Sequence, residues 1–105
     1  GLERAKMAWD KMISIALKKG IKVVLMSPSP DQRINILEAN TVLEHHAAQI
    51  KRLSEKYGIG FVDSYRMFQQ RVVSGEHITK YMSQVNHPNE NGHELIANGI
   101  MRYFK

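Results

Sequence analysis

The sequence predicts an α/β protein built on a parallel sheet, and three observations lead to this prediction. Stretches with helical periodicity alternate with short runs rich in β-branched residues, in the order helix, strand, helix, strand, helix. Glycines stand where the helices should end, and polar or proline-rich segments follow both strands. This order is typical of parallel strands joined by right-handed crossovers.

The N-terminal segment has the pattern of an amphipathic helix followed by a buried strand. Gly20 stands where a helix ends in a left-handed residue. The continuous apolar run from Lys22 to Ser27 suits a strand buried on both faces, and Pro28 and Pro30 then end regular structure. The expected inward face of the helix consists of Leu2, Ala5, Trp9, Met12, Ile13 and Ala16.

A second helix and a second strand follow. The helical pattern begins near residue 36 or residue 40 and runs to Tyr57, where a glycine closes it. Thr41 and Glu44 resemble a capping box at its start. The apolar run 59–63 then predicts a second short strand.

Two more helices are expected in the C-terminal part of the protein. Ser64 is the expected cap of a helix through Val73. Residues 76–86 have no clean periodicity and are expected to form a loop with one turn. Asn89 is the expected cap of a final helix that reaches Phe104. The inward positions of this helix are Leu95, Ile96, Gly99, Ile100 and Phe104.

Two strands make an incomplete sheet. Doubly wound domains usually contain about five strands, so the missing strands are expected upstream of this chain or in a partner. Residues 1–105 are therefore interpreted as the C-terminal portion of a single domain. On its own, this portion is expected to self-associate through an uncovered strand edge, unless it is one piece of a larger ordered chain.

The composition excludes several classes of function. The 105 residues include no cysteine, which rules out a disulfide framework, a thiolate zinc site and a cysteine nucleophile. A net charge of +5 comes from scattered basic residues, without the aromatic interleaving of a nucleic-acid site. No apolar stretch approaches the ~20 residues of a membrane span. The five histidines show no metal-ligand spacing, so we expect no metal and no cofactor.

Polar residues follow both predicted strands, where ligands bind in open parallel sheets. Ser27–Asp31 follows the first strand, and Asp63 with Ser64 follows the second. A third candidate is His87, which precedes the final helix in the segment HPNENGH.

That segment carries a family resemblance. HPNxxGH before an apolar helix, the SPSP sequence at 27–30 and YGIGFVD at 57–63 resemble the closing part of SGNH/GDSL-type hydrolases. The similarity runs from Leu2 to the last residue. It implies a three-layer α/β/α fold with a flavodoxin-like parallel sheet, of which only the C-terminal part is present. It also implies serine-dependent hydrolysis of small-molecule carboxylic esters, including acetylated carbohydrates, without a cofactor.

The same resemblance gives His87 the role of general base, which takes a proton from a serine and returns it to the leaving group. The family's GDS-like serine motif is absent, so the nucleophile is expected upstream of Gly1. The family has an aspartate three residues before the histidine, where this protein has Gln84. Glutamine accepts a hydrogen bond from imidazole but brings no charge. Asp31 and Asp63 are alternative acids because both follow strands.

Two hypotheses remain open at this point. In the first, the parent protein is an esterase and these 105 residues alone are inactive, because they lack a nucleophile. In the second, the sequence belongs to a catalytically degenerate binding module for carbohydrate or protein, which Gln84 favours.

Overall fold

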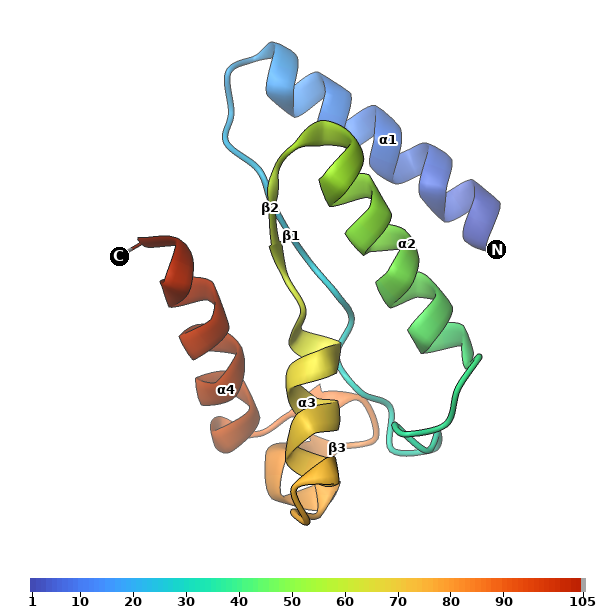
Figure 1. Ribbon diagram of the computed structural model, residues 1–105, viewed down its shortest axis with the longest axis vertical. Helices are drawn as coiled ribbons and strands as arrows, with labels where there is room; N and C mark the ends of the chain where they lie inside the picture. The colour runs from blue at the N-terminus through green and yellow to red at the C-terminus, as the bar shows by residue number, and fades with distance from the viewer. Residues whose placement is uncertain (105) are drawn as a thin grey trace.

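The computed structural model describes residues 1–104 and has a pair of parallel strands with helices on both sides (Figure 1). Strands β1 and β2 pair so that Val24 faces Gly60 and Met26 faces Val62. The predicted order of elements is confirmed as a mixed α/β fold with a parallel sheet. The elements are α1 (Leu2–Lys18), β1 (Val24–Met26), α2 (Val42–Tyr57), β2 (Gly60–Val62), α3 (Ser64–Val73), η1 (Ile78–Tyr81), β3 (Met82–Gln84), β4 (His87–Pro88), α4 (Glu90–Met101) and η2 (Arg102–Phe104).

Helices α1 and α2 lie side by side and cover one face of the strand pair (Figure 1). Their contact is an apolar cluster of Ile13, Leu25, Ile50 and Leu53, each at most 6% exposed. Gly20 has φ +76° just after α1, as predicted. The expected inward position of Met12 is wrong, because its side chain is 54% exposed.

Strand β1 is buried on one face only, which corrects the prediction of two buried faces. Leu25 points into the cluster with α1 and α2, whereas Val24 and Met26 are 45% and 40% exposed. Their neighbours on the same face of β2 are Gly60 and Val62. On this face the segment after α4 lies against β2, because the Tyr103 ring approaches Gly60. The same face of β1 stays largely exposed to solvent. That further strands cover β1, from upstream or from a partner, stays a prediction.

The helix starts show which predicted caps form. Thr41 Oγ1 accepts a hydrogen bond from the Glu44 amide at 3.2 Å, as predicted, and α2 begins at the next residue. In a capping box the Glu44 side chain would accept a hydrogen bond from the backbone N–H of Thr41. Here Glu44 Oε1 accepts instead from the backbone N–H of Asn40. The cap of α3 is Asp63, not Ser64, because the Ser64 hydroxyl is used elsewhere.

A second apolar cluster joins α3, η1 and α4, and it explains an error in the sequence prediction. Residues 76–86 form η1 and most of a β3–β4 hairpin instead of a loop with one turn. Tyr81 is buried, and its ring meets Phe68 edge-on at 6.1 Å between centroids. The buried members of this cluster are Ile36, Tyr65, Phe68, Tyr81, Met82 and Leu95.

The last helix begins as predicted and ends earlier. Asn89 is its N-cap, and its Oδ1 accepts a hydrogen bond from the Gly92 amide at 3.0 Å. The α-helical part ends at Met101, and a 3-10 turn continues to Phe104. The predicted inward position of the Phe104 side chain lies outside what the structure describes. Within residues 1–104, no helix combines the length and apolar character needed to cross a membrane.

Candidate active site

The carboxyl ends of β1 and β2 meet at a buried junction, as the parallel arrangement predicts. Ser27 Oγ donates to Asp63 Oδ1 at 2.9 Å and accepts a hydrogen bond from the Tyr65 amide at 2.9 Å. Ser64 Oγ donates to the Ser27 carbonyl at 2.8 Å. Ser27 is 1% exposed, and its hydroxyl is used both as donor and as acceptor. It therefore joins the two strands and is not available as a nucleophile.

The two alternative acids are both held by other groups. Asp63 Oδ1 also accepts from the Arg66 amide at 3.2 Å, so this carboxylate caps α3. Asp31 binds the Arg33 guanidinium through both oxygens, at 3.0 and 2.6 Å. Hydrogen bonds from Arg33 lower the pKa of Asp31 to about 2. Among the described residues, neither carboxylate is hydrogen-bonded to His87.

His87 lies on the β3–β4 hairpin, directly across from Gln84. A turn of two residues, Val85 and Asn86, separates them, so positions three apart in sequence become cross-strand partners. Side chains of such partners have Cβ atoms about 5 Å apart on one face of the ladder. This pairing places Gln84 beside His87 on the hairpin. Both side chains are exposed.

Gln32 connects the proline-rich segment to this hairpin. The backbone N–H of Gln32 donates a hydrogen bond to the Val85 carbonyl at 2.7 Å, and the side-chain Nε2 donates to the Gln84 carbonyl at 2.7 Å. The turn that carries His87 is thus bound to the segment that follows β1. Gln32 was not among the predicted site residues, because no local pattern marks it beyond its position in the segment after the first strand.

The asparagine and glycine of HPNxxGH fix the hairpin to the start of α4. The Asn89 amide donates to the Tyr81 carbonyl at 2.9 Å, and its Nδ2 donates to the Lys80 carbonyl at 2.9 Å. A Cβ atom on Gly92 would lie 2.2 Å from the Tyr81 carbonyl oxygen and 2.8 Å from Pro88 Cβ. Only glycine permits this close approach, so the motif specifies the position of the residue before Pro88.

The site shows no arrangement of metal ligands. Across residues 1–104, no three histidine, aspartate or glutamate side chains are grouped closely enough to hold a metal ion.

A comparison with solved structures identifies the fold. A member of the lipolytic protein G-D-S-L family from Veillonella parvula DSM 2008 matches with a TM-score of 0.81 and 19% sequence identity. The match covers 99% of this chain and 54% of that one, so the residues described here span about half the length of the protein they resemble. The resemblance to the GDSL type is thereby confirmed for the fold. No model of a protein family matches the sequence, and no curated protein does.

The junction at Ser27 should contribute measurably to stability. Replacing Ser27 by alanine leaves the Tyr65 amide without its acceptor and removes one of the two donors to Asp63 Oδ1, so we expect a loss of about 1–3 kcal/mol in the free energy of unfolding. Denaturant titration measures the change. Ser29→Ala, which removes a hydroxyl two residues on, is the matched control and should change stability by less than about 0.5 kcal/mol. Equal effects of the two variants would contradict the role of the junction.

The close approach at Gly92 gives a second prediction. Gly92→Ala forces the Tyr81 carbonyl away, and we expect a loss of roughly 2–4 kcal/mol despite the better helix propensity of alanine. Gly99→Ala on the same helix is the control, because its nearest neighbour would be the flexible end of Met67, at 2.9 Å. Thermal unfolding should show the larger shift for Gly92→Ala. A larger shift for Gly99→Ala would count against the proposed contact.

Proposed function

We propose that the full-length protein hydrolyses carboxylic esters, among them acetylated carbohydrates, with His87 as general base and a nucleophilic serine upstream of Gly1. The observation that carries this proposal is the position of His87. It lies on a hairpin fixed to the start of α4 and bound by Gln32 to the segment after β1. Active sites of open parallel sheets lie beyond the carboxyl ends of the strands. A fold shared with a lipolytic G-D-S-L protein supports the reaction class.

In this mechanism the neutral imidazole accepts the serine proton as the hydroxyl oxygen attacks the ester carbonyl. The resulting imidazolium then gives that proton to the leaving alcohol. A water molecule repeats the two transfers and releases the acid. The amide oxygen of Gln84 accepts a hydrogen bond from the other ring N–H, which selects the productive tautomer. Without a negative charge, Gln84 stabilises the imidazolium less than an aspartate does.

Substitution of His87 tests the proposal directly. His87→Ala should lower the turnover of a chromogenic acetate or butyrate ester by the full-length protein by ~10⁴-fold or more, because the serine loses its base. His93→Ala, which removes an exposed imidazole six residues later, is the control and should retain activity. Residues 1–105 alone should show no turnover. Equal rates of the wild type and His87→Ala would refute this function.

Gln84→Asp restores the family's acid and should raise turnover by about tenfold, since a carboxylate beside the ring stabilises the imidazolium. The pH–rate profile of the variant should also differ from that of the wild type, because an ionisable group now stands next to the imidazole. Gln70→Asp adds the same charge on α3 and is the control. Unchanged turnover together with an unchanged profile would show that Gln84 does not face the imidazole.

A binding module for carbohydrate or protein is the second candidate. The observation that favours it is the absence, in the described residues, of any carboxylate hydrogen-bonded to His87. This candidate is supported if the full-length protein binds acetylated oligosaccharide saturably and hydrolyses no ester, with or without Gln84→Asp.

A further inference from the structure

The C-terminal turn η2 places Tyr103 at the outer edge of β2, on the side of this strand that does not pair with β1. The Tyr103 hydroxyl accepts a hydrogen bond from the Phe61 N–H at 2.7 Å and donates one to the Phe61 carbonyl. One side chain therefore occupies both backbone groups of the central residue of β2.

The pairing of the two strands shows that these groups of Phe61 face away from β1. The Ser27 N–H donates to the Val62 carbonyl at 3.0 Å, so the backbone groups of Val62 face β1. Successive residues of a strand direct their backbone groups to opposite sides, so those of Phe61 face outward. Unpaired N–H and C=O groups at such an edge are a template for the addition of another strand.

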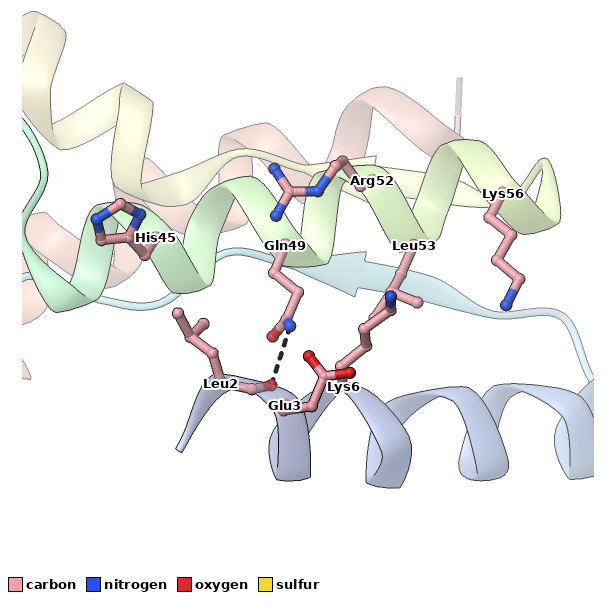
Figure 2. A pocket seen from close by; sticks show the side chains of 8 residues that line it. All are labelled: Leu2, Glu3, Lys6, His45, Gln49, Arg52, Leu53 and Lys56. Atoms are coloured by element: carbon pink, nitrogen blue, oxygen red, sulfur yellow. Dashed lines mark hydrogen bonds between the residues drawn. The ribbon is translucent and has the colours of Figure 1, made fainter.

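The Tyr103 ring reaches this edge over the face of the strand pair that α1 and α2 do not cover. On the covered face, Phe61 packs against the apolar cluster of the two helices. These helices are also joined to each other, because Gln49 Nε2 donates to the Leu2 carbonyl at 2.9 Å (Figure 2). On the opposite face, a Cβ atom on Gly60 would lie 3.0 Å from Tyr103 Cε1. Glycine at position 60 therefore leaves the space that the ring occupies.

We propose that Tyr103 closes a strand-addition site, and that the outer edge of β2 pairs with the same edge of a second copy of the protein once Tyr103 is removed. In an antiparallel ladder two residues directly opposite each other exchange both N–H···O bonds, whereas in a parallel ladder the bonds of one residue go to two different residues. Around a two-fold axis, Phe61 of a second copy supplies the donor and the acceptor that the Tyr103 hydroxyl supplies now. The occupant is therefore a second copy in antiparallel orientation, and Tyr103 prevents this pairing.

Amide hydrogen exchange of the full-length protein tests whether Tyr103 closes the edge. Tyr103→Phe keeps the ring and removes the hydroxyl, so the Phe61 amide should exchange about tenfold faster than in the wild type. The Val62 amide faces β1 and should not change. The matched control is Tyr57→Phe, which removes a hydroxyl bonded to Asp10 and should leave Phe61 exchange within about twofold of the wild type. Unchanged exchange at Phe61 in Tyr103→Phe would overturn the proposal.

Analytical ultracentrifugation of full-length Tyr103→Ala over a range of concentrations tests the occupant. This variant also removes the ring, so it should associate at concentrations about tenfold or more below those at which the wild type does. The Phe61 amide should regain protection as the dimer forms. Met101→Ala removes another exposed side chain at the end of α4 and should behave as the wild type. Association only at wild-type concentrations, or association without renewed protection of the Phe61 amide, would count against the second copy.

Discussion

The hydrogen bond from Ser27 to Asp63 is the contact on which the carboxyl edge of the parallel strand pair depends. It joins the ends of the two parallel strands, and the same carboxylate oxygen caps α3. The direction of α3 is therefore tied to the end of β1, 36 residues earlier in the sequence. Because α3 contributes Phe68 to the second apolar cluster, the junction also determines where Tyr81 and the following hairpin lie.

From Tyr81 onward, backbone groups determine the position of the candidate base. The Tyr81 carbonyl accepts the Asn89 amide and lies against Gly92, so the hairpin and α4 form one unit. Gln32 connects this unit back to the segment that follows β1. The imidazole of His87 can thus remain exposed for chemistry while the backbone that carries it is held on two sides.

Much of this arrangement follows from local sequence, and the rest depends on distant contacts. The periodic helices, the left-handed Gly20 and the Asn89 cap are predictable, because neighbours in sequence determine them. The hairpin at His87 was missed, because Tyr81 and Met82 are buried against residues from α3 and α4 rather than by a local pattern. The exposed face of β1 was also missed, since an apolar run does not reveal which neighbours are present. The HPNxxGH motif located His87, but Gln32 has no local signature.

How much the missing charge at Gln84 matters for the imidazolium depends on how far water is excluded from the two side chains. A unit charge about 4 Å from an imidazolium contributes only about 1 kcal/mol in water, and about four times as much at a protein surface with an effective dielectric constant near 20. The hairpin carrying Gln84 and His87 is exposed in these residues, so solvent screens the pair and the cost of the lost charge lies towards the lower of these two values. In the proposed reaction a bound ester would exclude water from the pair, and the cost of the missing charge would then be larger. The gain in turnover from Gln84→Asp therefore measures how far water is excluded around His87 in the proposed reaction.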